Sequence, residues 1–395
     1  MGNLVTAPVA SATLGISEDT IKKWHKRDII RSWQNDQGQT VFDLSEVSEQ
    51  SEKSSGIYRK NRYRILASEE KTGYRCVELF AGAGGTALGM ANAGIEHVAL
   101  VENDKDCIAT LRSNRPNWNV IGKDVRTMSF VGMEADIVQG GFPCQSFSYA
   151  GKSMGFGDTR GTLFFEFARC VNEIRPSIAI GENVRGLVSH DGGKTLATMV
   201  KSLNEIGYRV RYQVLRSQYL DVPQKRERLL IVGIREDLDL PFIFPEENNY
   251  TISLMEAIGD RPLSDGQKYS DYKKKVMDLV PEGGCWVDLP EDIKKTYMGG
   301  SYLLAGGKTG MARRLSWSEP SLTLTCSPSQ KQTERCHPEE TRPLNIREYA
   351  RIQTFPDEWE FSGSMFSQYK QIGNAVPVNL GYHIGRCAIE MLNSK

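Results

Sequence analysis

One cysteine lies in a segment whose composition suits a shaped loop better than a buried strand. Residues 140–148 read GGFPCQSFS, so Cys144 follows two glycines, Phe and Pro shortly after the apolar stretch 135–138. Open α/β sheets place their active sites in such loops, at the carboxyl ends of strands. A lone cysteine is more often a small buried hydrophobe, but these neighbours make a poor core strand. The segment therefore favours a nucleophilic thiolate at position 144.

A glycine-rich segment and a later acid indicate a site for a nucleoside. Residues 80–85 read FAGAGG after the apolar residues 75–79, and Glu102 ends the next apolar stretch about twenty residues further on. Glycines at a strand-to-helix turn let the backbone approach a ligand, and the helix N-terminus that follows favours an anionic group. An acid at this spacing can bind ribose hydroxyls. Taken alone, these residues fit a nicotinamide or flavin cofactor nearly as well.

An ordered series of short motifs resembles DNA (cytosine-5) methyltransferases of the bacterial restriction-modification type. The similarity runs from about residue 75 to residue 380. Besides FAGAGG, Glu102 and GGFPCQSFS, its segments are GKDV (122–125), DTRGTLF (158–164), ENV (182–184), QKRER (224–228), RPLNIRE (342–348) and QIGNAVP (371–377). The resemblance implies an enzyme that transfers a methyl group from S-adenosylmethionine to C5 of cytosine in double-stranded DNA.

The resemblance also implies a role for individual residues. Cys144 would add to C6 of the cytosine, Glu182 would donate a proton at N3, and Arg228 would bind O2. Asn183 would orient Glu182, and Arg226 would support the catalytic loop. The implied cofactor-binding residues are Phe80, Gly82, Gly84, Gly85, Glu102, Asn103, Asp124, Val125, Pro143, Leu163, Asn374 and Val376. No metal is expected.

The target base has to leave the duplex to reach these groups, at a cost of a few kcal/mol. Residues 249–336 correspond to the target recognition region of the family, and their side chains would contact base edges and phosphates. Lysines at 273–275 are expected to hold phosphates. The expected DNA-binding residues are Gln145, Ser148, Lys152, Arg160, Thr323, Gln330, Lys331 and Arg335.

These residues need an α/β framework. Apolar stretches at 75–80, 97–101, 135–138, 177–180 and 229–232 alternate with helical patterns. Such alternation predicts a doubly wound, mostly parallel sheet, a Rossmann-like methyltransferase fold. The predicted domains are a catalytic and cofactor-binding domain (73–248), a small irregular target recognition domain (249–336) and a C-terminal segment that completes the catalytic domain (337–395).

Residues 1–50 predict a small module that resembles a MerR-like helix-turn-helix. One helix is expected over 5–14, a turn at 15–17, and a second helix with Ser17 as N-cap and with Ile21 and Trp24 buried. A short hairpin is expected at 38–42. Such a module would bind operator DNA as a transcriptional autoregulator. Residues 51–72 are predicted to be a linker, beginning in a Ser-rich disordered joint (48–56) and continuing into a basic, Tyr-containing run (58–64) that suits phosphates.

Bulk properties limit the remaining possibilities. The 395 residues carry 49 basic and 49 acidic side chains, and this neutral total neither supports nor excludes a DNA partner. The eight cysteines form no C-x-x-C pair, and no leader or membrane-length apolar run is evident. We therefore expect a cytoplasmic protein, without a membrane partner, that is monomeric in catalysis.

Two other functions compete with this interpretation. The first is a DNA-binding regulator whose methyltransferase domain is silent, but the presence of Cys144, Glu182, Arg228 and Asn374 argues against a dead enzyme. The second is the tRNA-methylating branch of the same family. The sequence Gly-Phe-Pro-Cys and the sizeable recognition region favour DNA.

Overall fold

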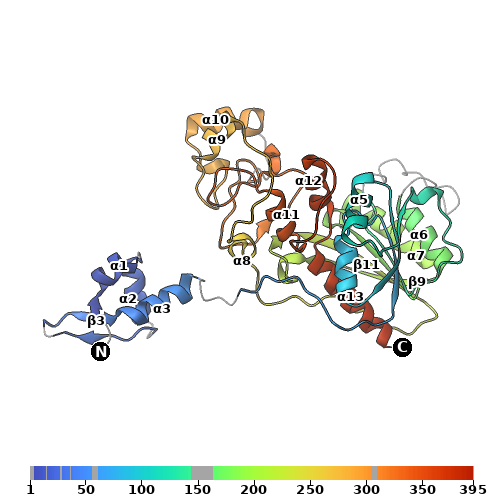
Figure 1. Cartoon of the computed structure of the whole chain (residues 1–395), viewed down its shortest axis with the longest axis horizontal. Coiled ribbons are helices and arrows are strands. Elements are labelled where there is room, and N and C mark those ends of the chain that lie inside the picture. Colours follow the sequence, from blue (N-terminus) through green and yellow to red (C-terminus); the bar gives the residue numbers. More distant parts are fainter. Residues whose placement is uncertain are drawn as a thin grey trace. The chain divides into compact units, whose positions relative to one another are not determined.

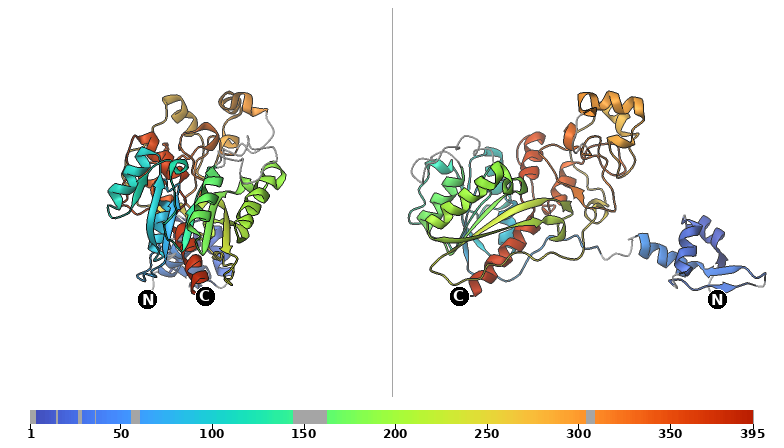
Figure 2. Two further views of the ribbon diagram at one scale, coloured as in Figure 1. Left: turned by 90° about the vertical axis from the view of Figure 1, so that its right-hand side faces the viewer. Right: turned by 180° about the vertical axis from the view of Figure 1, so that it is seen from behind.

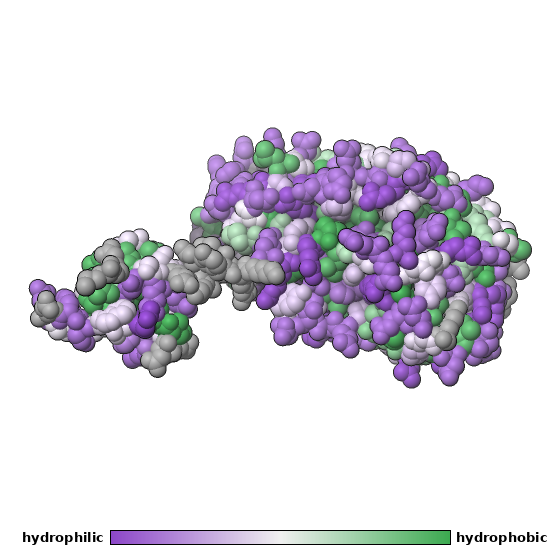
Figure 3. All heavy atoms as spheres, turned by 60° about the horizontal axis from the view of Figure 1, so that its bottom comes forward, coloured by the Kyte–Doolittle hydropathy of each residue, from purple (hydrophilic) through white to green (hydrophobic). Residues whose placement is uncertain are grey.

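The computed structural model describes residues 4–14, 16–26, 29–35, 37–55, 61–143, 163–303 and 309–394. The chain forms two compact units, Met1–Arg62 and Tyr63–Lys395, and each is described by itself. In Figure 3 the visible surface of both units is mostly hydrophilic, with apolar side chains scattered over it. Within the described residues, no helix is long and apolar enough to cross a membrane.

The N-terminal unit packs three helices against a three-stranded antiparallel sheet of order β1-β3-β2. The second helix begins after Ser17, whose Oγ accepts a hydrogen bond from the Thr20 amide at 3.2 Å, and it buries Ile21 and Trp24 as predicted. The first helix is shorter than predicted, because residues 4–6 pair with β3 as a strand. The elements are β1 (Leu4–Thr6), α1 (Ala7–Leu14), α2 (Glu18–Lys26), β2 (Trp33–Gln34), β3 (Thr40–Asp43) and α3 (Leu44–Ser55).

The expected disordered joint at 48–56 is wrong for most of its length, because helix α3 continues to Ser55. Val47 on this helix is fully buried in the small core of the unit, beside Ile21 and Phe42. Burial of one apolar residue against the core stabilises a helix that its polar composition alone would not.

The main unit is built on a seven-stranded sheet of order β6-β5-β4-β7-β8-β11-β9 (Figure 1). The first five strands in this order are parallel, and β11 runs antiparallel to both β8 and β9. The predicted mostly parallel sheet is confirmed. The strands are β4 (Arg75–Leu79), β5 (Glu96–Glu102), β6 (Val120–Gly122), β7 (Ile137–Gly140), β8 (Ile178–Val184), β9 (Tyr208–Arg216) and β11 (Glu227–Arg235).

Helices cover both faces of this sheet (Figure 2). Alternate strand residues point to opposite faces: Ile178 and Ile180 pack with α4 and α13, whereas Ala179 packs with α6 and α7. Both faces are therefore buried, which explains why the strands read as continuous apolar stretches. The helices are α4 (Gly85–Asn92), α5 (Lys105–Asn114), α6 (Leu163–Ile174), α7 (Lys194–Glu205), α11 (Ile346–Ile352), α12 (Met365–Asn374) and α13 (Val378–Asn393).

The described part of the target recognition region is mostly irregular, as predicted, and it also contains short helices. It has its own core, in which Met277, Tyr297 and Cys336 are buried. Leu254 and Ile258 pack instead with the core that contains α11, so the first part of the region belongs with the C-terminal segment. The elements are α8 (Leu254–Ile258), α9 (Asp271–Met277), α10 (Glu291–Met298) and the two-residue strand β12 (Ser321–Leu322), which pairs with β10 (Gln224–Lys225).

An extended segment, residues 63–72, lies along the main unit and is called the strap. The Tyr63 hydroxyl donates to the Arg351 carbonyl at 2.9 Å, and the Leu66 amide donates to Asn379 Oδ1 at 2.9 Å. The Ser68 amide donates to the Asn92 carbonyl at 2.8 Å. The expectation of a linker is therefore wrong for these residues, and Tyr63 faces the protein core instead of a phosphate.

Candidate active site

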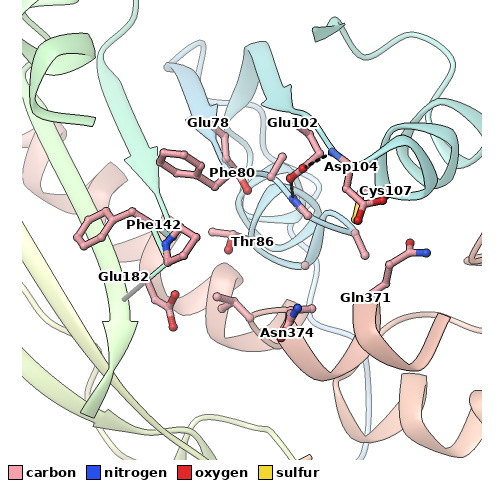
Figure 4. A pocket seen from close by; sticks show the side chains of 18 of the residues that line it. Glu78, Phe80, Thr86, Glu102, Asp104, Cys107, Phe142, Glu182, Gln371 and Asn374 are labelled. Atoms are coloured by element: carbon pink, nitrogen blue, oxygen red, sulfur yellow. Dashed lines mark hydrogen bonds between the residues drawn. The ribbon is translucent and has the colours of Figure 1, made fainter. Parts of the chain in front are cut away.

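A cavity of about 910 Å³ opens at the carboxyl ends of the parallel strands. Its walls come from the ends of β4, β5, β7 and β8, from β11, and from the C-terminal end of α12 (Figure 4). Every predicted cofactor-binding residue except Gly84 lines it, as do Glu182, Asn183, Arg226 and Arg228. The sequence-predicted residues are thus brought together at one edge of the sheet, where open α/β folds bind ligands.

The glycine-rich loop takes a conformation that needs its small residues. Gly82 has φ 54° and Gly84 has φ 86°, in the left-handed region that favours glycine. A Cβ on Gly85 would lie 2.0 Å from the Val376 carbonyl oxygen. The start of α4 is therefore pressed against the C-terminal motif, and Gly84 packs against Leu111 instead of lining the cavity.

Glu102 fixes the loop to the end of β5. Its Oε2 accepts a hydrogen bond from the Gly82 amide at 2.7 Å, and its Oε1 accepts from the Asn103 and Asp104 amides at 2.8 Å (Figure 4). The carboxylate lies in the cavity wall, where the resemblance puts a ribose-binding acid. These contacts show that Glu102 also organises the protein side of the site.

Asp124 also lines the cavity, just after β6, the strand next to β5. It caps the short helix Val125–Thr127 by accepting from the Arg126 amide, and the neighbouring Arg126 guanidinium lowers the pKa of its carboxyl group. Asp124 therefore remains an anionic acceptor at neutral pH. Among the residues that the structure describes, no cluster of His, Cys, Asp and Glu is suited to hold a metal ion.

Glu182 and Arg228 form an ion pair in the cavity. They lie on neighbouring strands, β8 and β11, and Arg228 Nε is 2.8 Å from Glu182 Oε1. Their side chains are only 12% and 13% exposed, so the pair is largely removed from water. Burial lowers the pKa of Arg228, and the Glu182 carboxylate opposes this shift. Gly141 leaves room for the acid, because a Cβ there would lie 3.2 Å from Glu182 Oε2.

Two further predicted catalytic residues hold backbone segments. The amide of Asn183 donates to the Phe142 carbonyl at 2.9 Å, so Asn183 orients the segment before Cys144 and not the Glu182 carboxyl group as predicted. Arg226 is 1% exposed and donates to the carbonyl oxygens of Gly373 (3.2 Å) and Ala375 (2.9 Å). It therefore fixes the C-terminal motif. Burial and the nearby Arg228 lower the pKa of Arg226.

The described residues do not include five of the predicted site residues, namely Cys144, Gln145, Ser148, Lys152 and Arg160. Pro143, directly before the predicted nucleophile, lines the cavity.

The predicted DNA-reading residues separate into two groups. Gln330 and Lys331 are exposed. Arg335 is 5% exposed, and its guanidinium donates to the Thr323 and Glu334 carbonyl oxygens. Its donors are already used inside the protein, so these contacts give Arg335 a structural role instead of the predicted one. The Thr323 hydroxyl donates to the Lys225 carbonyl at 2.7 Å.

Sequence reasoning missed other residues of the cavity wall. Cys326 and Gln139 line it, and the Cys326 thiol donates to Asn374 Oδ1 at 3.3 Å. The Gln139 side chain is buried, and its Oε1 has no hydrogen-bond partner among the described residues. Gln139 directly follows the predicted strand 135–138, and a polar residue at that place could have been predicted to line the site. Cys326 comes shortly after Thr323 in the sequence but has no motif of its own.

The family model for C-5 cytosine-specific DNA methylases matches residues 74–390. The chain belongs to this family. It is 50% identical to the type II methyltransferase M.Eco47II of Escherichia coli, over 96% of this chain and 94% of that protein. It is 47% identical to the type II methyltransferase M.PspPI of a Psychrobacter species, over 99% and 97%. A prophage-encoded Escherichia coli protein classed as a DNA modification methyltransferase has the same fold, with TM-score 0.60 and 22% identity over 81% of this chain and all of that one.

These matches establish a DNA (cytosine-5) methyltransferase of the type II restriction-modification kind. DNA is therefore its substrate, as predicted. The match to M.PspPI spans nearly the whole chain, so it includes the N-terminal unit that precedes the family model.

Proposed function

We propose that this methyltransferase uses S-adenosylmethionine to methylate C5 of a flipped-out cytosine in double-stranded DNA through a covalent adduct with Cys144. The observation that carries the proposal is the shared cavity: the glycine-rich loop, the Glu182–Arg228 pair and Pro143 all line it. A cofactor held by the first group and a base held by the second would lie in one enclosure.

The residues present fit S-adenosylmethionine. Gly82 and Glu102 form a cradle in the cavity wall, where a Cβ on Gly82 would meet no protein atom within 4 Å. The buried Gln139 oxygen offers an unused acceptor for hydroxyl or ammonium donors. When bound there, the cofactor supplies an electrophilic methyl group on a sulfonium. The chain supplies the groups that activate the cytosine.

The proposed reaction begins with the Cys144 thiolate, which forms a C–S bond at C6 of the base. The ring electrons move toward N3, which takes a proton from the protonated form of Glu182, and O2 accepts a hydrogen bond from Arg228. C5 then has enamine character and takes the methyl group. A solvent base removes the C5 proton, the thiolate leaves C6 and the N3 proton returns to Glu182, which restores the double bond between C5 and C6 and the neutral base.

The paired geometry of Glu182 and Arg228 suits this chemistry. In the pyrimidine ring N3 is bonded to C2, the atom that carries O2. The two side chains that would contact N3 and O2 lie within ion-pair distance of each other. Entry of the base would exchange this internal pair for two contacts with the ring. A low-dielectric cavity strengthens such contacts where charge develops.

Plasmid methylation followed by bisulfite sequencing tests the reaction and finds the target. We expect 5-methylcytosine at one defined sequence. Cys144→Ser should bind DNA but lose methyl transfer, and a duplex with 5-fluorocytosine at the target should trap wild type covalently, because fluorine cannot leave as a proton does. Full turnover by Cys144→Ser, or preferential methylation of tRNA, would contradict the proposal.

A second proposed activity belongs to the N-terminal unit: it binds operator DNA and represses the enzyme's own gene. Helices α1 and α2 are followed by the strand pair β2–β3. Helix α2 buries Ile21 and Trp24 on one face and exposes Lys22, Lys23 and Lys26. Such a basic helix can meet a DNA backbone. Deletion of residues 1–56 should abolish a footprint on the upstream promoter. An unchanged footprint would remove the regulatory role.

A further inference from the structure

The segment that follows Cys326 begins at the active site. Residues 327–333, called here the tip loop, start one residue after a side chain that lines the cavity. Since an extended chain spans at most about 3.5 Å per residue, Gln330 lies within roughly 14 Å of Cys326. With DNA rising about 3.4 Å per base pair, that distance covers roughly four pairs beside the target cytosine.

The tip loop presents side chains suited to base edges. Gln330, Lys331 and Gln332 are exposed, whereas the residues that follow, Glu334 and Arg335, are buried. Gln can pair with adenine and Lys with guanine in the major groove. How strictly these side chains can discriminate between bases depends on how firmly the backbone of the tip loop is held.

One half-buried lysine holds the tip loop at Ser329 and just beyond its C-terminal end, at Glu334. Lys273 on α9 donates from Nζ to the Ser329 carbonyl at 2.6 Å, and the same ammonium lies 2.6 Å from Glu334 Oε1. The Glu334 side chain is 0% exposed and accepts a further hydrogen bond from the Tyr297 hydroxyl at 3.2 Å. The Lys273 ammonium also lies 5.0 Å from the centre of the Tyr269 ring.

This arrangement corrects the phosphate-binding expectation for Lys273, the first of the lysines at 273–275. The Lys273 side chain is 18% exposed and points into the protein, whereas Lys274 is 55% exposed and pairs with Asp278 at 3.0 Å. A buried ion pair is a weak source of stability, because removing both charges from water costs about as much as their attraction returns. Fixing one backbone geometry is the better explanation for such a pair.

We propose that Lys273 and Glu334 form a clamp that fixes the tip loop, and that the clamp sets how strictly the enzyme discriminates its DNA sequence. Lys273 is thus a positioning residue that acts through Gln330 and Gln332. The proposal rests on the methylation of duplex DNA proposed above. The clamp makes no contact with Glu182, Arg228 or the cofactor cradle, so loosening it should spare the chemical step.

The test compares Lys273→Met with its exposed neighbour, Lys274→Met. Substrates are a duplex oligonucleotide with the bisulfite-determined site and duplexes with one base pair changed beside the target cytosine. For Lys273→Met we expect the ratio of kcat/KM between correct and altered sites to fall about tenfold or more, through a higher KM for the correct site. The kcat at saturating DNA should stay within about twofold.

Two further variants keep the outcome decisive. Lys273→Arg keeps a cation and should retain most of the discrimination. Glu334→Gln keeps the side-chain volume but removes the charge, so it should lose part of the discrimination. Glu334→Gln also tests the clamp if Lys273→Met does not fold. Unchanged discrimination in folded Lys273→Met or Glu334→Gln, or an equal loss in Lys274→Met, would overturn the clamp. Failure of wild type to methylate cytosine C5 would instead overturn the proposed function.

Discussion

In the proposed mechanism Glu182 donates a proton to the base, which its amide analogue cannot do. Glu182→Gln keeps the shape but removes the proton donor, so we expect kcat to fall by roughly 10²–10⁴-fold, the usual contribution of one general acid. Single-turnover transfer of labelled methyl groups measures this loss, and gel shifts should show that DNA binding persists. Glu205→Gln, an exposed acid on α7 paired with Lys201, is the control and should be unchanged.

At the residue scale His337 should also make stability depend on pH. It is fully buried, and its Nδ1 accepts hydrogen bonds from the Glu339 and Glu340 amides, so burial lowers its pKa to about 4. The unfolded chain therefore binds a proton below pH 6.5 that the folded protein does not. Stability should fall as the pH drops from about 6.5 to about 4, by no more than about 3 kcal/mol.

Urea unfolding at several pH values measures the His337 effect. His337→Asn retains an oxygen that can accept from the same two amides but does not titrate. Its free energy of unfolding should therefore fall less steeply across this range than that of wild type. If the free energies of unfolding of the two proteins change equally with pH, His337 does not contribute to the pH dependence of stability.

Residue types allowed the cofactor site to be predicted, but side-chain directions could not be read from them. Glycines and acids at strand ends converge because parallel strands end at one edge of the sheet. Lys273 and Arg335 lie in a region without a clear period, so nothing in the sequence showed that they point inward. Asn183 was assigned the wrong partner, Glu182, because successive side chains of a strand point to opposite faces of the sheet.

At the scale of elements, the packing of α4 against α13 fixes one wall of the active site. A Cβ on Gly89 would lie 2.2 Å from the Val378 carbonyl oxygen and 2.5 Å from the Tyr382 amide nitrogen. Gly89→Ala must therefore push the helices apart, which typically costs about 1–3 kcal/mol. The shift would reach Val376, which lines the cavity and follows α12.

We expect Gly89→Ala to lower the melting temperature and to weaken binding of S-adenosylmethionine. Differential scanning calorimetry and isothermal titration calorimetry measure the two effects. Gly186→Ala is the matched control, because its added Cβ would meet nothing within 4 Å. Equal melting temperatures and cofactor affinities in the two variants would show that the helices adapt without moving the site.

Helices and strands were predicted correctly where short stretches of sequence determine them, and incorrectly where tertiary contacts do. The main sheet and helix α2 follow from apolar periodicity and a Ser cap, both visible in short stretches of sequence. The end of helix α3 was predicted as a disordered joint and the strap as part of a linker, because both are held by tertiary contacts that their local sequence does not show. The Leu66 amide, for example, is paired by Asn379, more than three hundred residues later.

At the scale of the whole molecule, the strap makes the boundary of the catalytic unit testable. The unit begins at Tyr63, whereas the family model begins at residue 74. The intervening residues hydrogen-bond to α13, to α4 and to Gly94, which follows α4. A chain starting at residue 63 should melt within about 2 °C of the full protein's second unit and keep its kcat. A chain starting at residue 73 loses several hydrogen bonds worth about 1 kcal/mol each, together with the apolar contacts of Tyr63 and Ile65. Its melting temperature should fall by about 5 °C or more, and equal melting of the two truncated chains would show that the strap is dispensable.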